Sequence, residues 1–157
     1  MNSLYLGVSG SGKTYQLRHI VLDELVRGKE VYVIGRPEEW SMFKDIHLLN
    51  VYNISKSDID KLLSVTNSLV IVDSIELIKD RDFIGDLCVS SRVKGNNLYI
   101  SAFELNMLSN RVLININNLY LGYLSGYQSL RELENMFCIK IRNKVEDLDS
   151  HNFLKVV

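Results

Sequence analysis

The sequence predicts an α/β fold in which a mostly parallel central sheet is flanked by helices, and three observations predict it. Strand-length apolar stretches alternate with helix-length stretches along most of the chain. Residues 69–72 are continuously apolar, as a central parallel strand buried on both faces should be. Between the first strand and the first helix, Gly7–Thr14 (GVSGSGKT) matches the phosphate-loop pattern G-x-x-x-x-G-K-[ST] at every fixed position.

The first elements follow from apolar spacing and from glycine and proline positions. Residues 3–7 form a buried strand, and the helix over 13–27 places Leu17, Val21, Leu22 and Leu25 on one face before a Gly28 cap. A β-branched strand is expected at 30–35 and a short strand at 47–53. The segment between them holds the only proline and the only tryptophan and is expected to be irregular.

The second half continues the alternation of strands and helices. Ser55 caps a helix that runs to about Val65, with Asp58 in its first turn. A strand over 68–74 precedes a helix from about Ile78 to Val93, which Gly95 closes. Further strands are expected at 97–103 and 113–124, a helix at 126–137 with Leu130 and Leu133 inward, and closing strands at 138–143 and 153–157. Such a sheet binds its ligand at the carboxyl ends of the strands.

Length and composition indicate one folded domain over residues 1–157. The chain is 46% hydrophobic with a formal net charge of −1, so it carries no global electrostatic signature of a nucleic-acid binder. A ring of subunits can nevertheless line a pore with a few local Lys or Arg side chains. Cys88 and Cys138 lie far apart and are expected to be reduced core thiols. No apolar run reaches the length of a membrane span and no basic leader precedes the first strand, so we expect a cytoplasmic location.

The phosphate-loop match predicts that the chain binds ATP with Mg²⁺. Backbone N–H groups around Gly10 and Gly12 would wrap the phosphates, and the helix N-terminus would add its positive dipole end. Lys13 would reach the terminal phosphates, and the Thr14 hydroxyl would ligate the metal ion. The residues expected to bind the nucleotide are Gly7, Ser9, Gly10, Ser11, Gly12, Lys13 and Thr14.

A second metal-holding group and a water-positioning carboxylate are expected at the end of a neighbouring strand. Asp73 ends the apolar run at 69–72 and is the expected partner of Mg²⁺. ATPases of the additional-strand class usually place a Glu directly after this Asp, but here the position is Ser74. Glu76 and Glu104 are the nearby carboxylates that could substitute, and we favour Glu76 because it leaves the same strand end.

Three further residues are candidates for catalysis. Ser101 lies near the end of the strand that, in this class, inserts between the phosphate-loop strand and the Asp73 strand, where it would point a polar group at the γ-phosphate. Arg92 precedes the same strand and is expected near the strand ends that converge on the γ-phosphate. It could reach a phosphate across a subunit boundary, as arginine fingers do, or be a surface side chain near a helix end. Arg111 is the second candidate finger. Trp40 is either a core aromatic residue or a contact in the loop after the second strand.

Taken in order, these motifs resemble the FtsK/HerA superfamily of P-loop DNA-pumping ATPases, most closely the small genome-packaging ATPases of membrane-containing viruses. The resemblance covers most of the chain and consists of the phosphate loop, EVYVIG leading into RPEEW, LVIVD, SSRVKGNNLYISA and the closing segment from Asn110. It implies a RecA-like (ASCE) P-loop NTPase fold. It also implies ATP hydrolysis that moves double-stranded DNA through a homo-oligomeric ring, often a hexamer.

Two departures from the family pattern keep other functions open. The expected Asp-Glu pair is Asp73-Ser74, and the Gln that usually ends the sensor strand is absent from ISAFE. No extra domain for DNA guidance or membrane attachment is expected, so a viral capsid or membrane-vertex protein would supply it in the host cytoplasm or the virion. The alternatives are a small-molecule, sugar-type P-loop kinase, although no Arg-rich lid is visible, and an ATP-binding assembly protein with weak hydrolysis.

Overall fold

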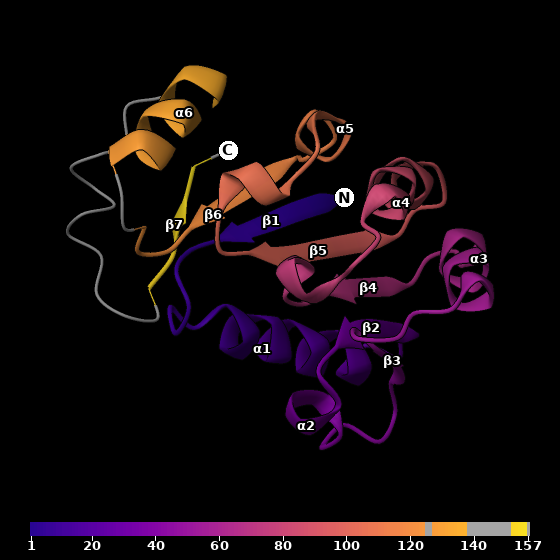
Figure 1. Ribbon diagram of the computed structural model, residues 1–157. Helices are drawn as coiled ribbons and strands as arrows, with labels where there is room; N and C mark the ends of the chain where they lie inside the picture. The colour runs from indigo at the N-terminus through magenta and orange to yellow at the C-terminus, as the bar shows by residue number, and fades with distance from the viewer. Residues whose placement is uncertain (125–126, 138–151, 157) are drawn as a thin grey trace.

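The computed structural model describes residues 1–124, 127–137 and 152–156 and places seven strands in one sheet (Figure 1). The strand order is β3-β2-β4-β5-β1-β6-β7. All neighbouring pairs are parallel except β6 and β7, which are antiparallel. The strands are β1 Asn2–Leu6, β2 Val31–Gly35, β3 His47–Asn50, β4 Leu69–Val72, β5 Asn97–Ala102, β6 Asn118–Leu121 and β7 Leu154–Lys155. The predicted mostly parallel α/β sheet is therefore confirmed.

Helices cover both faces of this sheet, as Figure 1 shows. Leu17 and Val21 of α1 (Lys13–Val26) and Trp40 of α2 (Pro37–Trp40) pack with Val31 and Val33 on one face. The opposite face carries the larger core, built with the helices α3 (Lys56–Ser64), α4 (Asp82–Val93), α5 (Asn110–Leu113) and α6 (Tyr127–Phe137). Two short 3₁₀ turns, η1 (Ile75–Leu77) and η2 (Leu105–Met107), follow β4 and β5.

Local signals set several element ends as predicted. Ser55 and Asp58 form a reciprocal capping box at the start of α3. Gly28 and Gly95 have φ values of 75° and 71° after α1 and α4, in the left-handed region that glycine adopts without steric cost. Leu130 and Leu133 of α6 are buried, as their spacing predicted.

Some predicted boundaries and faces differ from the structure. Leu22 is 48% exposed, and Glu24 takes its place on the buried face of α1, because position 22 is rotated about 100° away from the buried Val21. The segment after β2 is not wholly irregular, since Pro37 opens the single-turn helix α2. The helix predicted from Ile78 begins only at Asp82 because η1 occupies residues 75–77.

Two predicted strands in the last third of the chain also differ from the structure or lie outside its described residues. The strand predicted over 113–124 is shortened to β6 because α5 occupies 110–113. The closing strand at 138–143, together with Cys138, lies outside the described residues. Cys88 is a free, fully buried thiol, as expected.

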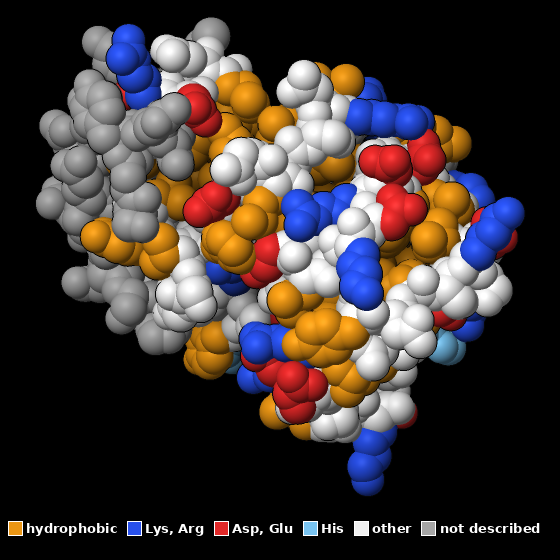
Figure 2. Space-filling model, in the orientation of Figure 1, with side chains coloured by type: hydrophobic (Ala, Val, Ile, Leu, Met, Phe, Trp, Pro, Cys, Tyr) orange, Lys and Arg blue, Asp and Glu red, His pale blue; other side chains and the backbone are white. Residues whose placement is uncertain are grey.

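The surface of the described residues carries charges of both signs. On the face shown in Figure 2, Lys and Arg side chains are interspersed with Asp and Glu, in keeping with the formal net charge of −1. Among the described residues, no helix is both long enough and apolar enough to cross a lipid bilayer.

Candidate functional site

The strand order brings the phosphate loop and Asp73 to the same edge of the sheet. β5 pairs with β1 on one side and with β4 on the other, so it is the inserted strand that the sequence predicted. Since β1, β5 and β4 are parallel, the residues that follow them all lie at their carboxyl ends. The phosphate loop follows β1, Ser101 lies near the end of β5, and Asp73 directly follows β4.

The phosphate loop is shaped by two left-handed glycines and closed by its lysine. Gly10 and Gly12 have φ values of 78° and 90°, and α1 begins directly after Gly12. The Lys13 ammonium donates hydrogen bonds to the carbonyl oxygens of Gly7, at 2.6 Å, and Val8, at 3.0 Å. Burial lowers the pKa of Lys13, and the charges of Glu76 and Asp73 act in the opposite direction. The lysine is thus held inside the loop, where phosphate oxygens can replace the two carbonyl groups.

Asp73 is the centre of a buried hydrogen-bond network. Its Oδ2 accepts bonds from Thr14 Oγ1 and from Trp40 Nε1, each at 3.0 Å. Its Oδ1 accepts a bond from Ser101 Oγ at 2.7 Å, and that hydroxyl in turn accepts the backbone N–H of Ser74 at 2.7 Å. Asp73 and Ser101 are 1% and 0% exposed. The carboxylate is thereby fixed beside the threonine that follows the loop lysine.

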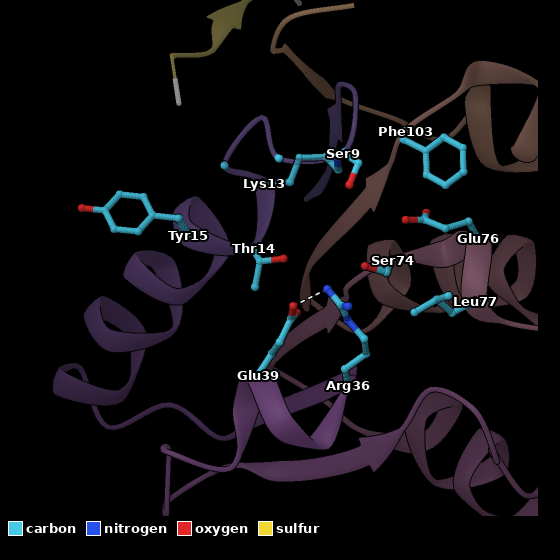
Figure 3. A pocket seen from close by; sticks show the side chains of 12 residues that line it. Ser9, Lys13, Thr14, Tyr15, Arg36, Glu39, Ser74, Glu76, Leu77 and Phe103 are labelled. Carbon is cyan, nitrogen blue, oxygen red and sulfur yellow. Dashed lines mark hydrogen bonds and ion pairs between the residues drawn. The ribbon is translucent and has the colours of Figure 1, made fainter. Parts of the chain in front are cut away.

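A pocket of about 460 Å³ opens beside this network (Figure 3). Its lining comes from the phosphate loop and α1, the ends of β2, β4 and β5, α2 and η1: Ser9, Gly10, Gly12, Lys13, Thr14, Tyr15, Arg36, Glu39, Ser74, Glu76, Leu77 and Phe103. Gly7 and Ser11, which were also expected to bind the nucleotide, do not line this pocket. They face each other, since a Cβ on Gly7 would meet Ser11 Oγ at 2.7 Å.

Glu76 points its carboxylate into this pocket from η1 (Figure 3). Its Oε2 is buried and has no hydrogen-bond partner. Burial raises the pKa of Glu76, although the positive charge of Lys13 acts in the opposite direction. A carboxylate with a raised pKa that faces the phosphate loop is suited to accepting a proton from water.

Ser74 lies at the position where ATPases of the additional-strand class usually have a glutamate. Its backbone is left-handed, with φ 67° and ψ 61°. The turn after Asp73 directs the chain into η1 and so brings Glu76 to the pocket.

The strand order and the phosphate loop after β1 together decide the fold class. The fold is that of a P-loop NTPase.

Solved structures support this assignment of the P-loop NTPase fold. The genome packaging NTPase B204 from Sulfolobus turreted icosahedral virus 2 in complex with AMP matches with a TM-score of 0.78 and 17% sequence identity, over 98% of this chain and 90% of that one. B204, the DNA-packaging ATPase from Sulfolobus turreted icosahedral virus, matches with a TM-score of 0.79 and 16% identity over the same shares. The pCW3 conjugation coupling protein TcpA with ATPγS has a TM-score of 0.72 and 17% identity, over 98% of this chain and 56% of that one. No protein-family model matches this sequence, and no curated protein sequence matches it either.

The structure brings most of the predicted site residues of this P-loop NTPase fold together. Lys13, Thr14 and Glu76 line the pocket, and the buried Asp73 is hydrogen-bonded to Thr14. Ser101 does not point into the pocket as expected, because it is fully buried and its hydroxyl is bonded to Asp73 and to the Ser74 N–H. Glu104, the other candidate carboxylate, is exposed and does not line the pocket.

Arg92 does not lie at the strand ends that converge on the phosphate site, and this part of the prediction is wrong. It is exposed in the last turn of α4, a helix that connects two parallel strands. Such a helix runs antiparallel to its strands, so its last turn lies at their amino ends, opposite the phosphate loop. Arg111, the second candidate finger, forms an ion pair with Asp86 of α4 at 2.5 Å and does not line the pocket.

Two pocket residues that the motifs did not indicate come from the segment after β2. Arg36 and Glu39 line the pocket beside Thr14, and they form an ion pair with each other. The position of Trp40, which the sequence left open, is also decided: it is fully buried and hydrogen-bonded to Asp73. The sequence feature that could have indicated Arg36 and Glu39 is their position directly after a strand of a parallel sheet, where ligands bind.

Proposed function

We propose that residues 1–157 act as one NTPase domain, a motor subunit that hydrolyses ATP and packages or translocates double-stranded DNA. The observation that carries the proposal is the pairing of Thr14 with Asp73 at the mouth of a fully formed phosphate loop. It occurs on a fold shared along almost the whole chain with a viral genome-packaging NTPase, which has also been solved in complex with ATPγS.

The residues at the loop mouth fit Mg²⁺ bound together with the nucleotide. Among the described residues, no cluster of three or more His, Cys, Asp or Glu side chains could hold a metal ion alone. Thr14 and Asp73 would therefore hold Mg²⁺ jointly with phosphate oxygens, which is how this ion usually binds in nucleotide sites. The ion would neutralise charge on the β- and γ-phosphates.

The remaining pocket residues divide the work of hydrolysis. Lys13 would bind the β- and γ-phosphates, and Glu76 would orient a water molecule and accept its proton. The water oxygen bonds to the γ-phosphorus while the bond to the bridging oxygen breaks, and ADP leaves with that electron pair. Ser101 would act through Asp73, which it holds by a 2.7 Å hydrogen bond.

Assembly into a homo-oligomeric ring, with six subunits as the working number, would complete the motor. Arg92 can act as a finger only in trans, where a neighbouring subunit turns the amino-terminal edge of its sheet toward this phosphate loop. Double-stranded DNA is the proposed substrate, and a capsid or membrane-vertex protein in the host cytoplasm or virion is the proposed partner. The kinase and assembly alternatives are not favoured, because the matching structures include genome-packaging and conjugation proteins.

The test is ATP turnover with and without double-stranded DNA, combined with mass determination of the assembly in nucleotide. Lys13→Ala should abolish nucleotide binding or turnover in a folded protein, and Asp73→Asn should weaken Mg²⁺-dependent hydrolysis. Lys44→Ala is the matched control, since Lys44 is exposed and lies outside the pocket. Normal turnover in folded Lys13→Ala protein would refute the phosphate-loop assignment.

The individual roles of Glu76 and Arg92 have their own test. Glu76→Gln and Arg92→Ala proteins should bind ATP but turn it over slowly, by about 10³-fold for a true finger. Mixing Arg92→Ala with Lys13→Ala subunits should partly restore turnover, because one interface then pairs an intact loop with an intact finger. Absence of rescue in rings shown to be mixed would exclude the trans role of Arg92.

A further inference from the structure

An arginine and a glutamate meet inside the phosphate pocket from one short segment of chain. Arg36 directly follows β2 and precedes α2, and Glu39 lies three residues later in α2. Figure 3 shows the Arg36 guanidinium and the Glu39 carboxylate pointing toward each other between Thr14 and Ser74. Arg36 is therefore a second cation in the pocket, across from Lys13.

The ion pair uses only part of the hydrogen-bonding capacity of the two side chains. Arg36 Nη2 contacts Glu39 Oε1, whereas Arg36 Nε and Glu39 Oε2 are both buried without a partner. A buried donor without an acceptor is unfavourable, and a guanidinium can donate several bonds at once to a phosphate. The pocket thus holds a guanidinium that is available to additional acceptors.

The segment that carries this pair is anchored to the metal-binding aspartate. Trp40, the last residue of α2, is fully buried and donates its indole N–H to Asp73. Arg18 of α1 donates a hydrogen bond to the carbonyl oxygen of Glu39. Because the backbone is held at both points, rotation of the Arg36 side chain is enough to exchange one acceptor for another.

The strand order determines which phosphate Arg36 can reach. The phosphate loop follows β1, whereas β2 lies beyond β5 and β4 in the sheet, on the far side of Asp73. A nucleotide whose β-phosphate lies in the loop extends its γ-phosphate toward Thr14 and Asp73, and so toward Arg36. The diphosphate lacks the group that extends this far.

We propose that Arg36 binds the γ-phosphate, with Glu39 as its counter-ion in the empty site, and thereby makes the pocket prefer triphosphates to diphosphates. This inference rests on the proposed nucleotide site. When Mg²⁺-ATP enters, the guanidinium leaves Glu39 for the γ-phosphate oxygens. When the γ-phosphate has gone, it returns to Glu39.

The test measures the affinities of the full chain for Mg²⁺-AMPPCP and Mg²⁺-ADP by calorimetry. Arg36→Ala should weaken AMPPCP binding about tenfold or more, as expected for loss of a charge-assisted bond, and leave ADP binding within about twofold. Arg36→Lys should restore part of the loss. Glu39→Gln should tighten AMPPCP binding several-fold without changing ADP binding, which tests the exchange even if the Arg36 variants do not fold.

Arg27→Ala is the matched control, because Arg27 forms the same i, i+3 ion pair with Glu24 at the far end of α1. It should change neither affinity. If Arg36→Ala weakens both nucleotides equally, or neither, while the parent still binds them through Lys13, the inference about Arg36 is wrong and the nucleotide site stands. If the parent binds no nucleotide, the proposed function itself fails and the inference fails with it.

Discussion

Replacing Trp40 by phenylalanine should show that the aromatic residue after β2 holds Asp73, the proposed partner of Mg²⁺, in place. Trp40 is fully buried, and its Nε1 lies 3.0 Å from Asp73 Oδ2. A hydrogen bond to a charged group contributes roughly 2 kcal/mol. The smaller ring would leave unfilled volume that costs roughly 1 kcal/mol more. Trp40→Phe should therefore lower the free energy of unfolding by about 3 kcal/mol.

For a chain of this length, about 3 kcal/mol corresponds to a fall in Tm of roughly 6–12 °C. The transition is followed by circular dichroism, because Trp40 is the only tryptophan and its replacement removes the tryptophan fluorescence signal. The affinity for Mg²⁺-nucleotide should fall as well, since Oδ2 also accepts the Thr14 hydroxyl.

A double-mutant cycle separates the hydrogen bond from the packing loss. In an Asp73→Ala background the bond no longer exists, so Trp40→Phe should cost only the roughly 1 kcal/mol that belongs to the cavity. An equal cost in the two backgrounds would refute the coupling between Trp40 and Asp73.

Three further predictions concern the buried groups around the site. Ser74→Gly should raise Tm by about 3 °C, because glycine adopts the observed φ of 67° without the roughly 1 kcal/mol that a left-handed non-glycine residue costs; a lower Tm would contradict this. Burial raises the pKa of Glu76, so ionisation of this carboxyl group destabilises the folded state. The destabilisation is absent below the ordinary pKa of 4.5 and complete above the raised pKa. Glu76→Gln should accordingly gain stability relative to the parent as pH rises above 4.5 in urea titrations, and a pH-independent difference would exclude this origin. Burial raises the pKa of Cys88 to about 12, so in a Cys138→Ser background the thiol should react with a disulfide reagent at pH 8 only after unfolding. Rapid reaction in the native state would show that Cys88 is accessible.

The sequence alone determined the parts of this protein that depend on contiguous residues. The phosphate loop needs glycines, a lysine and a threonine at fixed spacing between a strand and a helix, so Gly7–Thr14 can be recognised without a fold. The apolar run that ends in Asp73 marks a central strand for the same local reason, and the capping box at Ser55 marks the start of α3. Fold class and the core of the nucleotide site were therefore predictable.

The tertiary structure decided which distant residues share the pocket. Arg36 and Glu39 meet the phosphate loop, and Trp40 meets Asp73, only because β2 pairs with β4 and both strands end at the same edge of the sheet. The same parallel arrangement carries Arg92 to the opposite edge at the end of α4. Strand order arises from long-range pairing and side-chain packing across the whole sheet, whereas sequence motifs record only the local conformation of the backbone.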